Sequence, residues 1–241
     1  MGITLIKIIN SNEHYKGQLG WLTTFHHFSF GEYRNPEKVN FGPLRVFNED
    51  FIQPGKGFGF HPHNNMEIVT FVLDGTLQHK DTMGNEGIIE AGEVQRMTAG
   101  TGVFHSEYNH SNDKVLHLLQ MWVFPDEENL KPSWEQKKFS KQDRTNRLLP
   151  IISQNKTNSS LTIHQDTSFY VSRLEGILDH NFSDNRLGYL FVIDGKLNLN
   201  GQNLSSQDAA MISNEKSIKL ASNGTCELIM IDLPEKFKEV T

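Results

Sequence analysis

Short hydrophobic runs separated by polar turns fill the chain. β-Branched and aromatic residues dominate runs such as TLIKII, EIVTFVLDG, GYLFVIDG and CELIMIDL, and Gly, Asn and Asp punctuate them. No segment carries a long apolar stripe with the 3.6-residue period of a helix, and only EENLKPSWEQKKF is suited to a short helical turn. Many short strands at turn-separated spacing predict an all-β protein, built as a sandwich or a barrel.

One strand–turn–strand pattern occurs twice. EIVTFVLDGTLQHKD contains the turn VLDG at residues 72–75, and GYLFVIDGKLNLNG contains VIDG at residues 192–195, so the two copies are 120 residues apart. Repetition of this kind predicts two tandem β domains. The connector lies near DEENLKPSWEQKK, which has the Pro, Glu and Lys content of a linker, and we divide the chain into domains 1–136 and 137–241.

The composition is that of a folded globular protein. The chain has 241 residues, of which 37% are hydrophobic and 22% are charged, and its formal net charge is -6. Because no basic stripe accompanies this charge, we expect no nucleic-acid partner. The mild acidity serves solubility.

Nothing in the sequence indicates secretion or membrane insertion. Cys226 is the single cysteine, so no internal disulfide forms, and the N-terminal residues lack a signal-peptide pattern. The longest apolar stretch, VLHLLQMWVF, is too short and too polar to span a bilayer. We therefore expect a cytoplasmic monomer that does not contact membranes.

Two histidine motifs carry the candidate chemistry. His61 and His63 flank a proline in HPH, and His105 and Glu107 are likewise two residues apart in HSE. Side chains at i and i+2 of a strand lie on the same face, so each pair points to one side of its strand. Gly-rich turns precede both motifs, which suits sharp turns at the mouth of a barrel.

Three imidazoles and one carboxylate from these segments form a ligand set for a first-row transition metal. Glu67 shares the parity of His61 and His63, so the pattern alone allows either Glu67 or Glu107 as the carboxylate. Cys is absent from the cluster, which argues against a four-thiolate zinc site. We expect one divalent ion, Fe(II) above all, while the overlap of ligand preferences leaves Mn, Ni, Cu and Zn open.

The motifs resemble those of a known family. The pattern around His61, His63 and Glu67 resembles the first cupin motif, although Gly75 comes one residue late, and the segment from Gly102 to Asn109 resembles the tail of the second. More specifically, the chain resembles the pirin family in the segments TTFHHFSFGEY, LRVFNEDFIQPGKGFGFHPH, GTLQHKDTMGN, QRMTAGTGVFHSEYN and LLQMWVFP. The resemblance is strong over most of the first 140 residues and weak afterwards. It points to the bacterial pirins described as quercetin 2,3-dioxygenase-like.

The resemblance implies a bicupin, with two tandem jelly-roll barrels and the metal in the first. It implies the metal ligands His61, His63, His105 and Glu107, and it leaves Glu67 as a candidate to orient an imidazole N–H. It also implies a dioxygenase that reacts a flavonol such as quercetin with O₂, opening the central ring with loss of carbon monoxide. Glu107 is the candidate general base for the flavonol hydroxyl.

A regulatory protein is the alternative function. Some pirins act through protein partners in transcriptional or metabolic control, and a metal-binding protein of that kind would sense metal or redox state. Oxygen uptake with a flavonol separates the two functions, because only the enzyme turns substrate over.

The second half lacks the ligands of the first. At the 120-residue offset, His61, His63 and Glu67 correspond to Asn181, Ser183 and Leu187. No histidine follows His180 that could replace His105. We therefore expect a metal-free second domain that covers or shapes the first.

Other histidines have less defined roles. His26 and His27 in TTFHHFSF are expected to pack or to bond the backbone rather than to line a pocket. His117 and Gln120 lie on one predicted strand and point to opposite faces, one of which looks into the barrel.

Overall fold

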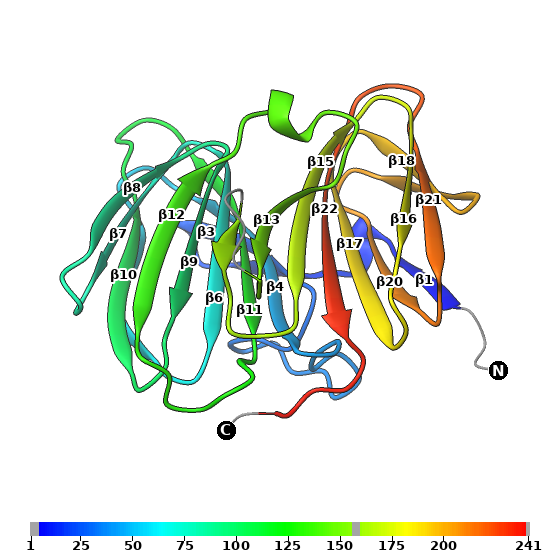
Figure 1. Ribbon diagram of the computed structural model, residues 1–241. Helices are drawn as coiled ribbons and strands as arrows, with labels where there is room; N and C mark the ends of the chain where they lie inside the picture. The colour runs from blue at the N-terminus through cyan, green and yellow to red at the C-terminus, as the bar shows by residue number, and fades with distance from the viewer. Residues whose placement is uncertain (1–4, 156–159, 240–241) are drawn as a thin grey trace. The chain divides into compact units, whose positions relative to one another are not determined.

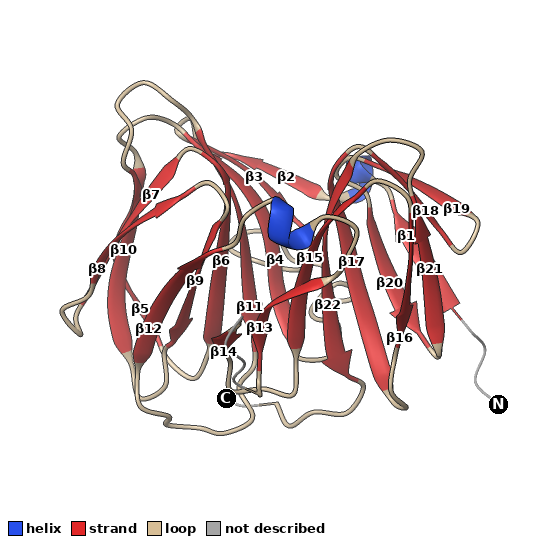
Figure 2. Ribbon diagram, turned by 45° about the horizontal axis from the view of Figure 1, so that its top comes forward, coloured by secondary structure: helices blue, strands red, loops and turns tan. Residues whose placement is uncertain are grey.

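The computed structural model describes residues 5–155 and 160–239, and these form β-strands joined by turns (Figures 1 and 2). The helical pieces of the described residues are two 3-10 segments, η1 (Ser11–Glu13) and η2 (Gln142–Arg144). No described helix is long and apolar enough to cross a membrane. The strands divide into two compact units, which confirms the predicted all-β fold with two barrels.

The N-terminal unit contains residues 15–139, residues 161–165 and the described residues from Lys238 on. Its seven-stranded sheet has the order β12-β9-β6-β11-β4-β3-β2, and its four-stranded sheet has the order β5-β10-β7-β8. The short strand β14 (Leu161–Thr162) also belongs to this unit. The bounds in the seven-stranded sheet are β2 (Tyr15–Gln18), β3 (Leu22–His26), β4 (Leu44–Ile52), β6 (Glu67–Asp74), β9 (Glu93–Thr98), β11 (Leu116–Val123) and β12 (Ser133–Lys138). Those in the four-stranded sheet are β5 (Gly57–His63), β7 (Thr76–Asp81), β8 (Glu86–Glu90) and β10 (Val103–Asn109).

The C-terminal unit contains the described residues of 1–14, 140–160 and 166–237. Its large sheet includes the order β1-β20-β17-β22-β15-β13, and its four-stranded sheet has the order β16-β21-β18-β19. The bounds in the large sheet are β1 (Leu5–Ile9), β13 (Leu149–Ser153), β15 (Ser168–Leu174), β17 (Arg186–Asp194), β20 (Ala209–Ser213) and β22 (Cys226–Pro234). Those in the small sheet are β16 (Ile177–Asn181), β18 (Lys196–Leu199), β19 (Gln202–Ser205) and β21 (Ser217–Ala221).

The two strand orders correspond to each other, so the predicted internal repeat is present. The hairpin turns of the repeat are Gly75 between β6 and β7 and Gly195 between β17 and β18, with φ of 85° and 93°. A Cβ at Gly195 would lie 2.3 Å from the carbonyl oxygen of Thr225, and one at Gly75 would lie 3.0 Å from Cα of Leu116. Both turns therefore need a residue that lacks a side chain and tolerates positive φ.

The boundaries of the two units differ from the predicted division into 1–136 and 137–241, because each unit includes a short segment from the other half of the chain. The change of unit falls between Phe139 and Ser140, and the first strand belongs to the C-terminal unit. There β1 pairs with β20, from Leu5↔Ser213 to Ile9↔Ala209, at the place that β12 fills beside β9 in the other unit. A five-residue apolar strand does not specify its partner locally, so sequence patterning does not reveal this pairing.

The expected helical turn near EENLKPSWEQKKF is wrong. Residues Ser133–Lys138 of that segment form β12, which pairs with β9 in the register Trp134↔Met97 and Gln136↔Gln95. Helix propensity is a weak preference, and here the open edge of β9 provides a partner that overrides it.

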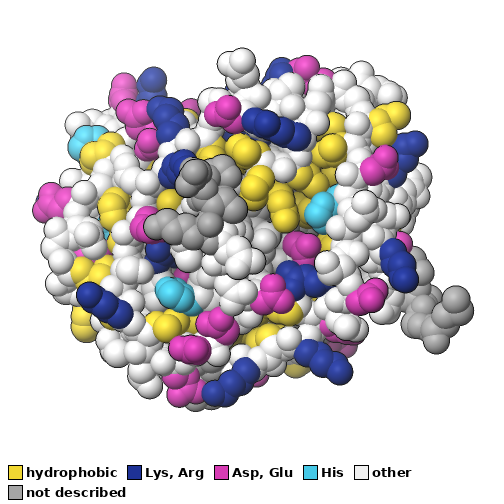
Figure 3. Space-filling view, viewed as in Figure 1, with side chains coloured by type: hydrophobic (Ala, Val, Ile, Leu, Met, Phe, Trp, Pro, Cys, Tyr) yellow, Lys and Arg dark blue, Asp and Glu magenta, His cyan; other side chains and the backbone are white. Residues whose placement is uncertain are grey.

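Charge is dispersed on the surface. On the face drawn in Figure 3, Lys and Arg side chains are interspersed with Asp and Glu. The described residues visible there form no continuous basic stripe, consistent with the net charge of -6.

Candidate metal centre

Strand pairing in the N-terminal unit brings three histidines together. The antiparallel register of β5 and β10 places His61 opposite His105 and His63 opposite Val103. The imidazole centroids of His61, His63 and His105 lie 4.5–4.9 Å apart, and their nitrogen ligand atoms all lie within 4.8 Å of one another. The two motifs of the sequence therefore meet across one pair of strands.

The protonation states suit metal ligation. Burial, together with the neighbouring imidazoles, lowers the pKa values of His63 and His105 to about 3, so both rings are neutral near pH 7. Nδ1 of His61 lies 2.7 Å from the carbonyl oxygen of Gly59. A carbonyl only accepts, so this Nδ1 carries the proton and the lone pair of the neutral ring is on Nε2.

His105 gives the clearest sign that the cluster fits a metal. Its side chain is buried, and neither ring nitrogen has a hydrogen-bond partner among the described residues. A buried imidazole in this state lacks the contacts that such groups normally make, and a bound cation supplies one of them. The donor set of the site therefore fits a transition-metal ion.

Glu107 enters the same region from β10. It lies two residues after His105, and the pairing with β5 is irregular between these two residues. A Cβ at Gly57 would lie 2.2 Å from the carbonyl oxygen of Glu107 and 2.5 Å from Cα of Tyr108. The missing side chain at Gly57 lets β5 approach the backbone of β10 closely at Glu107 and Tyr108.

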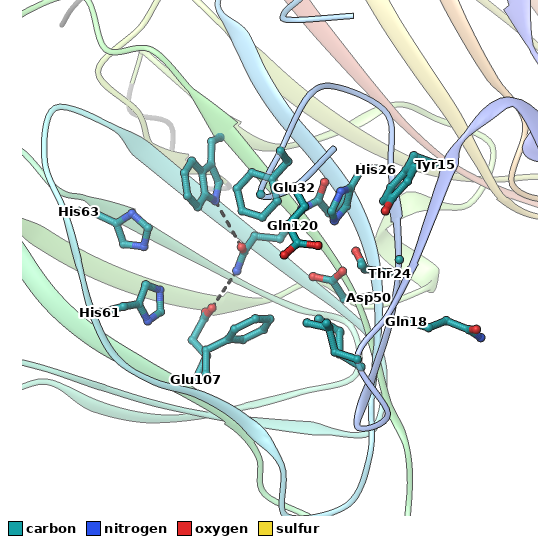
Figure 4. Close-up of a pocket in the computed structure, with 18 residues that line it drawn as sticks. Tyr15, Gln18, Thr24, His26, Glu32, Asp50, His61, His63, Glu107 and Gln120 are labelled. Carbon is teal, nitrogen blue, oxygen red and sulfur yellow. Dashed lines mark hydrogen bonds between the residues drawn. The ribbon is translucent and has the colours of Figure 1, made fainter. Parts of the chain in front are cut away.

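Amide side chains fix the orientation of the Glu107 carboxylate. Gln95 Nε2 donates to Oε1. Gln120 Nε2 donates to Oε2 at 2.7 Å (Figure 4). The Thr70 hydroxyl lies 3.4 Å from Oε1. Both oxygens are thus held by donors on the seven-stranded sheet.

Two indoles determine which way these amides face. Nε1 of Trp134 donates to Oε1 of Gln95 at 2.9 Å, and Nε1 of Trp122 donates to Oε1 of Gln120 at 3.3 Å. An indole N–H only donates, so each amide oxygen turns to the tryptophan and each NH₂ turns to Glu107. The network presents donors to an acceptor and holds a carboxylate in place.

His79 is a member of the site that sequence reasoning missed. It is fully buried on β7, and together with His105 and Glu107 it forms a second group whose ligand atoms lie within 4.8 Å of one another. Its Nε2 lies 3.2 Å from Oδ2 of Asp81, and its ring stacks on Trp134. In the strand TLQHKD, His79 is two residues from Leu77, so the alternation of side chains could have indicated that both point into the barrel.

Glu67 lies in a different environment from the one expected. It is the first residue of β6, fully buried, and the groups that influence its charge include Arg96 and Thr98. Burial raises its pKa to about 7, against the opposing effect of Arg96. The described contacts of Glu67 include no histidine side chain of the cluster. The strand break between His63 and Glu67 ends the shared parity, so the predicted orienting role has no support in this geometry.

A cavity of about 360 Å³ opens beside the histidines. His61, His63 and Glu107 line it, together with aromatic walls from Phe30, Phe58 and Trp122. This volume is at the small end of the range of ligand pockets. The cavity therefore suits a compact aromatic molecule next to the metal ligands.

A row of polar residues crosses the inner face of the seven-stranded sheet beneath this cavity. Successive strands β3, β4, β11, β6 and β9 pair in register through the row His26, Asn48, Gln120, Thr70 and Gln95. One end of the row reaches Glu107, and the other end reaches the far wall of the cavity.

The remaining predicted histidines separate by face. His26 lines the cavity, contrary to the expectation that it only packs. Burial lowers its pKa to about 4. His27 packs on Phe47, and His117 bonds Glu49 at 2.8 Å, so Gln120 is the member of its strand that faces inward.

Comparison with known proteins places this fold and site. The family model described as pirin matches residues 9–123, and the model of the quercetinase C-terminal cupin domain matches residues 150–233. A protein named quercetin 2,3-dioxygenase from Escherichia coli (strain K12) is 38% identical over 234 residues, which cover 95% of this chain and 99% of that protein. The chain belongs to the pirin family.

Solved pirin structures match nearly the whole chain. The crystal structure of YhhW from Escherichia coli superposes with a TM-score of 0.92 at 37% identity and covers 98% of this chain and 100% of its own. A second structure, described as bacterial pirin YhhW in complex with nickel(II), has the same TM-score and identity over 96% of this chain and 100% of its own. The two-barrel architecture of this pirin is therefore that of an experimentally known bicupin.

Among its described residues, the C-terminal unit of this pirin carries no comparable cluster. His180 is on β16, and its cross-strand partner is Ile218, where His61 in the N-terminal unit faces His105. Leu178 and Leu220 form the next pair, and apolar residues of this unit pack into one core cluster. Both groups of candidate metal ligands found among the described residues lie in the N-terminal unit.

Proposed function

We propose that this pirin is a metal-dependent dioxygenase that cleaves a flavonol such as quercetin with O₂. The observation that carries the proposal is the convergence of His61, His63 and His105, of which His63 and His105 have lowered pKa values, beside a cavity with aromatic walls that Glu107 also lines. The name quercetin 2,3-dioxygenase on the relative from Escherichia coli supports the reaction type.

We propose His61, His63, His105 and Glu107 as the ligands of one divalent ion, Fe(II) in the first place, with Ni, Cu, Mn and Zn as further candidates. The nickel(II) complex of the pirin from Escherichia coli supports a metal in this family member. When bound, the ion would lower the pKa of a substrate hydroxyl and provide the centre at which substrate meets O₂.

The chain's own groups would bind the flavonol and move its proton. The aromatic walls pack on the flat rings and exclude water from the reacting oxygens. Glu107, held by Gln95 and Gln120, would accept the proton of the flavonol hydroxyl. Addition of O₂ and loss of carbon monoxide would then leave a ring-opened ester, which accounts for all atoms of the two reactants.

Oxygen consumption tests this function. We expect the Fe(II)-loaded protein to consume one O₂ and release one carbon monoxide per quercetin, while the metal-free protein does neither. The measurement combines an oxygen electrode with carbon monoxide detection, for each candidate metal in turn. Failure of every metal-loaded form to turn over any flavonol would contradict the enzyme and favour a regulatory protein.

We also expect one metal per chain. The C-terminal unit offers Ile218 opposite His180, and an aliphatic side chain cannot ligate a metal. Elemental analysis of the loaded protein is expected to give a metal-to-protein ratio near one. A ratio near two, with the second ion assigned to residues 140–237, would show that the C-terminal unit has a site of its own.

A further inference from the structure

Four polar side chains cluster on the wall of the cavity away from the histidines. Thr24 pairs with Asp50 across β3 and β4, and His26 pairs with Asn48 in the same register. Residues two apart on a strand share a face, and all four line the cavity. Figure 4 shows Thr24, His26 and Asp50 across the cavity from His61 and His63.

The cluster contains buried atoms that lack partners. Asp50 and Asn48 are 3% and 2% exposed, and Oδ1 of each has no hydrogen-bond partner among the described residues. The His26 residue is 8% exposed, and its Nδ1 also has no hydrogen-bond partner among the described residues. Leaving several buried polar atoms unpaired costs stability, so their common direction into a cavity points to a ligand.

The chemistry of the cluster selects hydroxyl groups. The oxygen of Asn48 accepts hydrogen bonds, and a carboxylate at Asp50 accepts them as well. Glu107 shares the cavity with Asp50, so an anionic group at this end would be repelled by nearby carboxylates. Burial, with Glu107 and Glu49, raises the pKa of Asp50 to about 7, while Thr24 acts in the opposite direction. A neutral donor such as a phenol matches these acceptors.

We propose that Asp50, Asn48 and His26 form a recognition subsite for a hydroxyl group of the substrate that is remote from its reacting oxygens. The substrate is then a polyhydroxylated aromatic molecule, held by the metal centre at one end and by this subsite at the other. The inference rests on the proposed function for the reaction and adds the specificity of the same cavity.

The test compares two flavonols in wild-type and variant protein. Quercetin carries hydroxyl groups on both ends of the ring system, whereas 3-hydroxyflavone keeps only the reacting hydroxyl and ketone. The affinity ratio of quercetin to 3-hydroxyflavone is measured by calorimetry on the Fe(II)-loaded full chain without oxygen. We expect Asp50→Leu to lower this ratio by about 10- to 100-fold, and Asp50→Asn, which keeps one acceptor, to lower it less.

Glu49→Gln is the matched control. Glu49 is the neighbour of Asp50 on β4, but its side chain lies on the other face and bonds His117. We expect the affinity ratio of this variant not to fall, because loss of the Glu49 charge lowers the pKa of Asp50 and leaves its carboxylate as an acceptor. Circular dichroism and metal content confirm that each variant is folded and loaded. Asp50→Leu removes a buried acid whose Oδ1 has no hydrogen-bond partner among the described residues.

The outcomes separate the subsite from the reaction. If the affinity ratio falls in Asp50→Leu but no form of the protein takes up oxygen, the subsite is supported and the dioxygenase activity is contradicted. Oxygen uptake with an unchanged ratio contradicts the subsite and means that only solvent occupies the cluster. If the wild type binds neither flavonol, the inferred substrate class is wrong.

Discussion

Replacing His61 or His105 by alanine is expected to abolish metal retention. Each imidazole provides one of four proposed ligands, and the three rings lie within contact of one another on β5 and β10. Loss of one ligand opens the coordination sphere and lowers the metal affinity. The decrease exceeds the roughly 10- to 100-fold loss of affinity that follows removal of an outer-shell partner. The metal content after gel filtration in the absence of free ion measures the effect.

His180→Ala and His117→Ala are the controls for this experiment. His180 is in the C-terminal unit opposite Ile218, and His117 bonds Glu49 away from the cavity. We expect both variants to retain one metal per chain. Full metal occupancy in both His61→Ala and His105→Ala would show that the proposed ligand cluster is wrong.

Glu107→Gln is expected to weaken metal binding moderately and to reduce flavonol oxidation much further. The carboxylate accepts from Gln95 and Gln120 at once, whereas an amide at position 107 offers an acceptor to only one of them. The other glutamine would have to rotate against the tryptophan that orients it. Loss of a general base typically lowers the rate about 10²–10⁴-fold.

The measurement is oxygen uptake per bound metal, with Glu67→Gln as the comparison. Glu67 is buried near Arg96 and Thr98 on β6, so we expect its variant to keep its metal and most of its activity per metal. A change in the melting temperature of Glu67→Gln would reflect the environment of Arg96 rather than the site. If Glu67→Gln loses more activity per metal than Glu107→Gln, the carboxylate has been assigned to the wrong residue.

Local pattern was enough for the fold class and for His61, His63 and His105, but not for His79. Period-two alternation and Gly-rich turns indicate strands, and the repeated VLDG and VIDG turns indicate two barrels, because a hairpin's geometry is encoded within a few residues. The same period puts His61 and His63 on one face of β5. The family resemblance, rather than spacing, provided the choice of Glu107 over Glu67.

What surrounds Glu107 was decided by strand pairing. Gln95 lies among other polar residues in EVQRMT, and Gln120 shares the strand LHLLQMWV with His117, so in the sequence nothing distinguishes them from surface positions. They meet Glu107 only because the register of β9, β6 and β11 aligns them in one row. Asp50 and Asn48 are further cases, since two polar residues in LRVFNEDFI do not show which face they take.

The sequence by itself determined that this chain forms two β barrels and that three histidines belong to one of them. Only the tertiary structure decided where β1 pairs, which carboxylate lies beside the imidazoles, and which polar residues line the cavity at its far end. The physical reason is that side-chain alternation along a strand is a local property. The partner and register of that strand depend on residues far away in the chain, and a site that draws on many strands exists only once all of those registers are set.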